Sequence, residues 1–162
     1  MRKLILLISF LLLAACGTEE SSNTTTNEKE NTQDEKATFL FDSKEKGIKV
    51  EDASGWTLIE EQDSNVVFEN GTLKAIITVI SEDNDFATLK QDLKTSAGDI
   101  TVLEESDTQL SFQTNRKESI RSDISLYKEG TKTQIITFMT KVENYKSNQS
   151  LIEEFSKKIK FY

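Results

Sequence analysis

The sequence predicts an α+β domain over residues 38–162, in which an antiparallel β-sheet is flanked by helices. From Phe39 onward, short runs alternate apolar and polar residues or are rich in β-branched and aromatic ones. Turn signals a few residues long separate most of these runs, which favours hairpins and therefore antiparallel pairing. Two longer stretches place apolar residues at helical spacing. Strands, a helix, strands and a helix follow in that order.

Five strands are expected in the first half of the domain, where apolar residues alternate with polar ones or are β-branched. They lie at 39–41, 47–52, from 56 onward, 66–69 and 73–81. Residues 53–55 read as a turn, and 63–65 end the strand that begins at Trp56. Asn70-Gly71 predicts a hairpin between the last two strands, because both residue types tolerate a positive φ.

A helix is expected over residues 86–97. Asp85 can cap its first turn, and Gly98 ends it. One face of this helix would carry the apolar residues Phe86, Leu89, Leu93 and Ala97.

The second half is expected to form a meander of strands and a final helix. The strands lie at 100–104, 109–114, 119–128 and 133–140, with a turn at Glu129-Gly130 between the last two. Ser147 is expected to cap a helix over 148–158. Its apolar stripe consists of Leu151, Ile152, Phe155 and Ile159. The chain ends in a short strand or tail.

Residues 1–15 are typical of an export signal. Arg2 and Lys3 precede the apolar run LILLISFLLL, and Ala14 and Ala15 provide small residues for cleavage. The apolar run has about 10 to 12 residues, whereas a helix needs about 20 to cross a bilayer. We therefore expect no stable membrane-spanning helix here.

The four residues Leu-Ala-Ala-Cys at 13–16 resemble the lipobox of bacterial lipoproteins. The resemblance implies that the Cys16 thiol receives a diacylglyceryl group and that a peptidase cuts between Ala15 and Cys16. Two acyl chains would hold the protein at the extracytoplasmic face of the cell membrane. The alternative is an ordinary secreted protein in which Cys16 has no such role.

Residues 16–37 are expected to be an acidic, disordered linker behind the lipid anchor. Residues 17–36 contain no large apolar side chain and cannot offset the entropy of becoming ordered. As a flexible coil, twenty residues reach roughly 25 Å. A binding tail is the alternative interpretation.

Composition excludes several partners and chemistries. Removal of residues 1–15 changes the net charge from −8 to −10, which disfavours nucleic acid and anionic lipid as partners. The chain has no histidine, and Cys16 is its single cysteine, so triads, Cys–His pairs and HExxH zinc sites are excluded. Glycine-rich phosphate loops are absent as well. We therefore expect no cofactor, no metal and no enzyme activity.

Three weaker patterns point to sites. Ser43 and Lys46 have serine–lysine spacing, but they fall in a highly charged turn, and such catalysis needs a buried lysine. The loop Glu82-Asp83-Asn84-Asp85 could offer oxygen ligands to Ca²⁺, or be a solvated loop that caps a helix.

Six aromatic residues could line a groove, although a role in the core is the favoured interpretation. Tyr145 is the one most expected to be exposed. The set is Trp56, Phe68, Tyr127, Phe138, Tyr145 and Phe155.

The domain resembles the PsbP-like, or Mog1-like, family. The resemblance rests on the order of the elements, on Gly47-Ile48-Lys49-Val50 in an early strand and on Gly55-Trp56 after a turn. It implies an antiparallel sheet with helices on both sides, an α/β/α sandwich. It also implies a binding or assembly role without a shared catalytic activity.

The leading hypothesis is a non-enzymatic, lipid-anchored protein that binds an envelope protein at the outer face of the cytoplasmic membrane. One alternative is a lipoprotein that binds a small ligand or a cation, with the 82–85 loop as the candidate site. Another is an envelope hydrolase that uses two carboxylates, which would need to lie about 5 to 10 Å apart in a cleft. A protein-binding module needs an exposed apolar patch instead.

Overall fold

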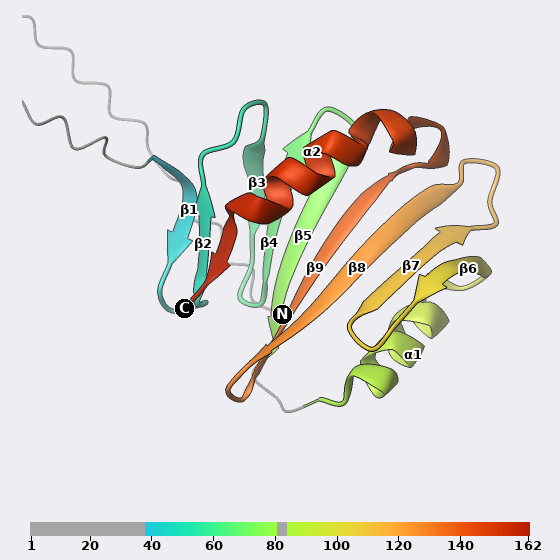
Figure 1. The fold of residues 1–162 in the computed structure, drawn as a ribbon, viewed down its shortest axis with the longest axis horizontal. Coiled ribbons are helices and arrows are strands. Elements are labelled where there is room, and N and C mark those ends of the chain that lie inside the picture. The colour runs from blue at the N-terminus through green and yellow to red at the C-terminus, as the bar shows by residue number, and fades with distance from the viewer. Residues whose placement is uncertain (1–37, 81–83) are drawn as a thin grey trace, which may run out of the picture. The chain divides into compact units, whose positions relative to one another are not determined.

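The computed structural model describes residues 38–80 and 84–162 (Figure 1). The strands of the first half are β1 (Phe39–Ser43), β2 (Ile48–Glu51), β3 (Thr57–Glu61), β4 (Asn65–Asn70) and β5 (Leu73–Ile80). Helix α1 (Phe86–Ala97) follows. The second half contains β6 (Ile100–Glu105), β7 (Gln109–Thr114), β8 (Ile120–Glu129), β9 (Lys132–Lys141), the 3₁₀ turn η1 (Val142–Asn144), α2 (Tyr145–Lys158) and β10 (Ile159–Phe161).

The strands form two antiparallel sheets. Seven strands make the large sheet in the order β3-β4-β5-β9-β8-β7-β6, and three make the small sheet in the order β1-β2-β10. In the large sheet, β9 pairs with β5, so the strands β8, β7 and β6 extend the sheet on the far side of β9. The antiparallel α+β class expected from the sequence is confirmed.

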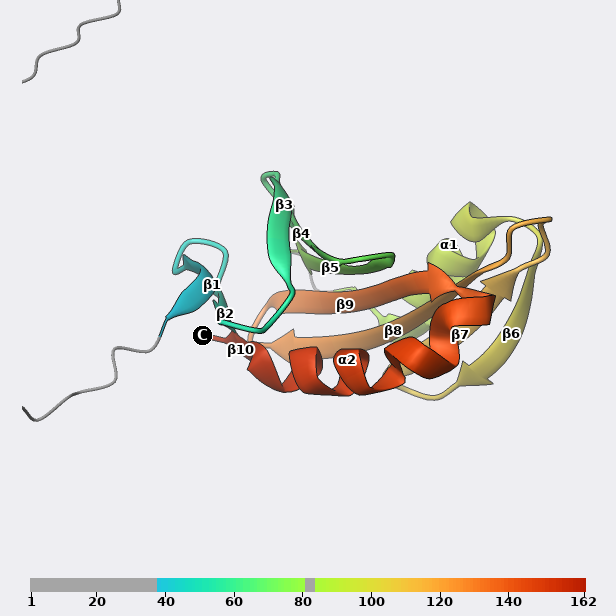
Figure 2. The ribbon, with the colours of Figure 1, turned by 90° about the horizontal axis from the view of Figure 1, so that it is seen from above.

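The two helices cover opposite faces of the large sheet, as Figure 2 shows. Helix α2 and the small sheet enclose one core with strands β4, β5 and β9. Phe155 of α2 is fully buried at its centre, and its ring stacks on Trp56 with centroids 3.8 Å apart. Phe68 and Phe138 meet the same ring edge-on. This arrangement packs one helix against strands far from it in the sequence.

Helix α1 covers the other face, over β7 and β8. Phe86, Leu93 and Ala97 pack against a second buried cluster that includes Leu110 and Leu126. Because side chains alternate along a strand, the residues between these buried ones point to the α2 side.

Both long hairpins turn on a glycine one position away from the expected centre. Asn70 pairs with Leu73, so the loop residues are Gly71 and Thr72, and Gly71 has a φ of 60°. The β8–β9 hairpin repeats this arrangement, with Gly130 at a φ of 60°. The expected hairpins are confirmed, but Asn70 belongs to the strand and not to the turn.

Helix α1 has the predicted bounds and cap. The Asp85 carboxylate accepts a hydrogen bond from the backbone N–H of Thr88 at 3.1 Å. The predicted start of α2 is wrong, because the helix begins at Tyr145, directly after η1. Ser147 lies inside the first turn, where its hydroxyl donates to the Asn144 carbonyl instead of capping. Ile159, expected in the helical stripe, is a buried residue of β10.

Several sequence predictions lie outside the described residues. These are the signal segment 1–15, Cys16 with the cleavage site after Ala15, the linker 16–37, and Glu82 with Asp83. The start of the domain at residue 38 stays a prediction. No helix among the residues described is both long and apolar enough to cross a membrane.

Candidate functional site

A polar groove lies between α2 and the outer strands β6, β7 and β8 of the large sheet. Its volume is about 190 Å³, and we call it the α2 groove. Strand alternation explains its polarity, because the apolar residues of β7 and β8 point toward α1 and leave polar ones facing α2. The polar lining consists of Glu104, Gln109, Ser111, Arg121, Asp123, Ser125, Tyr145, Gln149 and Glu153.

Arg121 occupies the α2 groove together with Asp123, two residues further along β8 and on the same face. Its Nε donates to Oδ1 and Oδ2 of Asp123 at 3.0 and 3.1 Å, and its Nη2 donates to Oδ1 at 2.9 Å. The Arg121 guanidinium carbon also lies 3.5 Å from the centroid of the Tyr145 ring. A bidentate ion pair and a cation–π contact therefore hold this arginine in one orientation.

These neighbours shift the ionisation of both side chains. Burial acts to lower the pKa of Arg121, but the hydrogen bonds and the charge of Asp123 outweigh it, and the pKa rises. Burial raises the pKa of the Tyr145 phenol, and the negative charge of Asp123 raises it further. At neutral pH the α2 groove therefore presents a guanidinium cation and a neutral phenol. Both groups can donate hydrogen bonds, and both have a flat face on which another group can stack.

The serine–lysine pattern does not form a catalytic pair. The Ser43 hydroxyl accepts a hydrogen bond from the backbone N–H of Lys46 at 3.3 Å, which closes the β1–β2 turn. The Lys46 ammonium group lies 3.4 Å from a carboxylate oxygen of Glu61 on β3. This lysine is therefore paired with Glu61 and is not positioned as the base of a serine–lysine pair.

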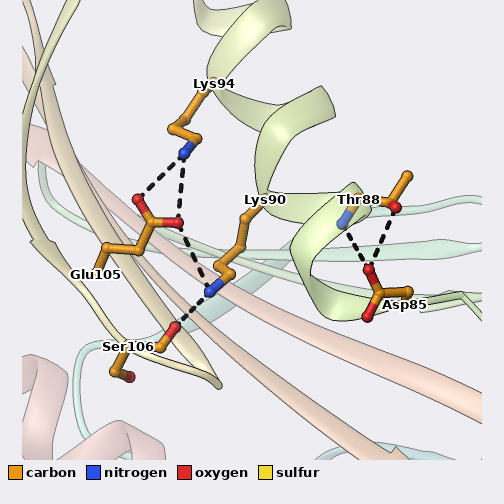
Figure 3. A network of polar contacts seen from close by, with 6 residues as sticks. All are labelled: Asp85, Thr88, Lys90, Lys94, Glu105 and Ser106. Carbon is orange, nitrogen blue, oxygen red and sulfur yellow. Dashed lines mark hydrogen bonds and ion pairs between the residues drawn. The ribbon is translucent and has the colours of Figure 1, made fainter.

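The described part of the acidic loop serves the fold. Asp85 caps α1, and this hydrogen bond from Thr88 lowers the pKa of the carboxylate (Figure 3). A cavity of about 360 Å³ lies beside it, lined by Asn84, Asp85, Phe86, Ala87, Lys90, Asp107 and Lys128. Its carboxylates are mixed with lysines. Residues 38–80 and 84–162 contain no group of three or more side chains suited to hold a metal ion.

A charged cluster that the sequence did not reveal ties α1 to the edge strand β6. Figure 3 shows Lys90 and Lys94 of α1 converging on Glu105. Lys94 donates to the Glu105 carboxylate at 3.1 and 3.3 Å, and the Lys90 ammonium group lies 3.6 Å from it. Lys90 is only 7% exposed and also donates to the Ser106 carbonyl. Both lysines contact the Glu105 carboxylate, so we assign this cluster a role in stabilising the fold.

Of the six aromatic residues considered for a groove, four belong to the core beneath α2. These are Trp56, Phe68, Phe138 and Phe155. Tyr145 lines the α2 groove but is half-buried, so the expectation that it is the most exposed of the set is wrong. Tyr127, at 44% exposed, is the exposed one, because it lies near the end of β8 beyond α2 and contacts Phe161 of β10.

Arg121, Asp123 and Glu104 line the α2 groove but were not predicted from the sequence as site residues. The alternation Arg121-Ser122-Asp123 places both charges on one face of a strand, and this signal was available. Tyr145 comes close to these two residues because α2 crosses the sheet, and Glu104 comes close to them because of the strand order. No local sequence pattern predicts either arrangement.

No family model matches the chain, and no curated protein matches it in sequence. Solved structures do match it. Cyanobacterial PsbP (CyanoP) from Synechocystis sp. PCC 6803 is 10% identical with a TM-score of 0.51, and the match covers 84% of this chain and 98% of that one.

The Ran-binding protein Mog1p of Saccharomyces cerevisiae is 12% identical with a TM-score of 0.52. The match covers 71% of this chain and 90% of Mog1p. At such identities the likeness concerns the fold alone. The domain has the fold of PsbP and Mog1, an antiparallel sheet with a helix on each face, as the sequence resemblance implied.

Proposed function

We propose that this chain is a lipid-anchored, non-enzymatic module that binds a protein partner at the outer face of a bacterial cytoplasmic membrane. In this proposal Cys16 carries the lipid after cleavage behind Ala15, and residues 16–37 form the spacer. Residues 38–162 form the recognition domain. The lipobox-like sequence at 13–16 supports the anchor.

The α2 groove is the proposed docking site, and the observation that carries this assignment is its Arg121–Asp123–Tyr145 arrangement. Tyrosine and arginine dominate the binding energy of protein interfaces, particularly where their side chains are held in place before binding. Here the ion pair and the ring contact fix the arginine. Glu104 and Glu153 add acidic groups to the lining, so a partner with basic or hydrogen-bonding side chains fits best.

Two exposed apolar residues precede Glu104 of the α2 groove in strand β6. Val102 and Leu103 of β6 are each 43% exposed, and Glu104 follows them directly in the chain. A polar groove beside exposed apolar side chains is the composition of a protein interface. Mog1p, which has the same fold, is a Ran-binding protein and so provides a precedent for protein recognition by this architecture.

Protein binding is favoured over hydrolysis by the contacts of Asp123 in the α2 groove. Asp123 accepts three hydrogen bonds from Arg121, so both of its carboxylate oxygens are engaged within the groove. The carboxylates of a glycan hydrolase must instead contact the glycosidic oxygen and the attacking water or the sugar.

The test is site-specific photocrosslinking in intact cells. A photoreactive amino acid replaces Gln149, which lines the α2 groove and is exposed. The control places it at Gln91, an exposed residue of α1 on the opposite face of the large sheet. We expect a single envelope protein to be captured from position 149 and not from position 91.

Two variants complete the experiment. Arg121→Ala should reduce capture from position 149 by about tenfold or more, since loss of an interface arginine typically costs over 1 kcal/mol. Cys16→Ala should move the protein out of the membrane fraction. Equal capture from both positions would reject the α2 groove, and membrane retention of Cys16→Ala would reject the lipid anchor.

A further inference from the structure

The small sheet and the chain around it carry a charge opposite to that of the rest of the domain. Residues 38–51 and 157–162 contain six lysines and three acidic residues, a net charge of +3. Residues 52–156 contain ten basic and nineteen acidic residues, a net charge of −9. The net charge of the whole chain, which disfavours an anionic surface as a partner, therefore does not describe this end of the domain.

Two of these lysines, Lys49 and Lys160, lie on the outer face of the small sheet, and Lys157 is exposed in the last turn of α2, just before β10. Ile48, Val50 and Ile159 point inward and are buried. Lys49 and Lys160 are direct partners across β2 and β10, so both point outward on the same face. Like charges directly opposite each other destabilise a sheet. On its other side Lys49 faces Asp42 of β1, whose carboxylate lies 3.9 Å from the Lys49 ammonium group, so this row of the sheet keeps an excess of one positive charge that an anion can meet.

Exposed aromatic rings accompany these lysines. Phe39 is 39% exposed, and the Lys49 ammonium group lies 3.9 Å above its ring. Tyr162 is 47% exposed, and its hydroxyl donates to Asp42 of β1. Cations mixed with aromatic rings are typical of surfaces that lie at the boundary of a lipid bilayer, where rings enter the headgroup layer.

We infer that the outer face of the small sheet binds the anionic headgroups of the membrane in which Cys16 is anchored. The inference rests on the proposed lipid anchor, which joins this end of the domain, because the chain enters β1 23 residues after Cys16. A linker of this length keeps the domain within roughly 25 Å of the lipid surface. Strand β1 of the small sheet is the first element that follows the linker in the chain.

The acidic linker is the competing occupant of this face. Residues 17–36 carry six acidic residues and two lysines, so their charge also complements the small sheet. They contain no aromatic or large apolar residue, and so cannot bury Phe39 and Tyr162. A bilayer interface offers both phosphate groups and an apolar boundary, and therefore matches the whole surface.

The test uses the chain from residue 16 with Cys16→Ala, so that no lipid contributes to binding. Flotation compares vesicles of phosphatidylcholine with vesicles that also contain phosphatidylglycerol. We expect binding only to the anionic vesicles, and a loss of binding as salt screens the charges. Replacing Lys49, Lys157 and Lys160 with Gln should weaken binding roughly 10- to 100-fold. The control replaces Lys74, Lys117 and Lys146, which are exposed elsewhere and change the net charge equally.

Each other outcome overturns the inference. Equal binding to both vesicle types, no binding to either, or equal losses in both triple variants would reject the small sheet as a headgroup site. Binding that arises only after deletion of 17–36 would assign this face to the linker. Circular dichroism of each variant checks that it is folded. Because the lipid is absent, failure here leaves the anchor proposal standing, and that proposal is judged by fractionation of Cys16→Ala cells.

Discussion

Phe155 is the residue on which the packing of α2 depends most. Its fully buried ring stacks on Trp56 and meets Phe68 and Phe138 edge-on, so it joins α2 to β4, β9 and the chain leading into β3. Aromatic pairs in such geometries add to the free energy of burying their surface.

We predict that Phe155→Ala lowers the free energy of unfolding by about 3–5 kcal/mol, because it removes a buried ring and leaves a cavity among three aromatic partners. Urea unfolding followed by tryptophan fluorescence measures this directly, since Trp56 is the single tryptophan and stacks on Phe155. Phe39→Ala, at an exposed position, serves as the control and should cost about 1 kcal/mol or less. Equal costs for the two variants would contradict the central role of Phe155.

At the residue scale, burial within a regular element could be predicted from the sequence, whereas contacts between distant elements could not. The helical spacing of Leu151, Ile152 and Phe155 indicated which face of α2 points inward. Tyr145 gave no such signal, because its burial depends on Arg121 of β8 lying beneath it. For the same reason, Arg121, Asp123 and Glu104 were not predicted as groove residues, although each belongs to a correctly predicted strand.

At the scale of elements, α1 is joined to the sheet edge by charge as well as by apolar packing. Lys94, through its hydrogen bonds, and then Lys90 lower the pKa of the Glu105 carboxyl below its ordinary value of 4.5. A carboxyl with a lowered pKa in the folded state stabilises the fold fully above its unfolded pKa. This contribution is lost as the pH falls through the folded value.

We therefore predict that acid weakens the wild-type fold partly through Glu105. The free energy of unfolding should fall as the pH drops below about 4.5, and the fall should be smaller in Glu105→Gln, which no longer titrates. Urea unfolding at a series of pH values from neutral downward measures both curves. Asp107→Asn, at a neighbouring exposed carboxylate, is the matched control and should keep the wild-type dependence. Parallel curves for wild type and Glu105→Gln would contradict the prediction.

The two edge strands of the large sheet share a pattern. Residues 57–61 read TLIEE and residues 101–105 read TVLEE, and both strands change register at the apolar pair. Bulges and charges at a sheet edge oppose pairing with the edge of another copy. The exposed apolar pairs can therefore remain on the surface, where they are available to a partner, without forming a continuous sheet between copies.

Element boundaries were predictable where a local signal fixed them. Asp85 and Gly98 flank α1, and both ends were correct. The start of α2 was wrong because η1 feeds directly into the helix without a side-chain cap, so Ser147 was the nearest residue that resembled one. The hairpins were expected from Gly71 and Gly130. Their exact register came from the pairing of the strands, which the turn sequences alone do not specify.

At the scale of the whole molecule, the proposals divide the chain into an anchor, a spacer and a domain with two separate surfaces. In these proposals the small sheet contacts the lipid headgroups, whereas the partner binds in the α2 groove, which is lined by β6, β7, β8 and the first turns of α2. In Figure 1 the small sheet lies at one end of the large sheet and β6 at the other, in agreement with the strand order. A membrane contact at one end thus leaves the α2 groove accessible to a partner.

This division predicts that the linker sequence is replaceable while its length is not. A chain in which residues 17–36 are exchanged for glycine and serine in equal number should stay in the membrane fraction and keep its crosslink from position 149, because a flexible spacer needs only reach. Deleting the same residues should retain the protein in the membrane but reduce the crosslink, since the domain would no longer reach its partner's surface. Quantitative blots of both fractions measure these outcomes. Loss of the crosslink after the exchange alone would instead assign partner binding to the linker, the alternative that its acidic composition leaves open.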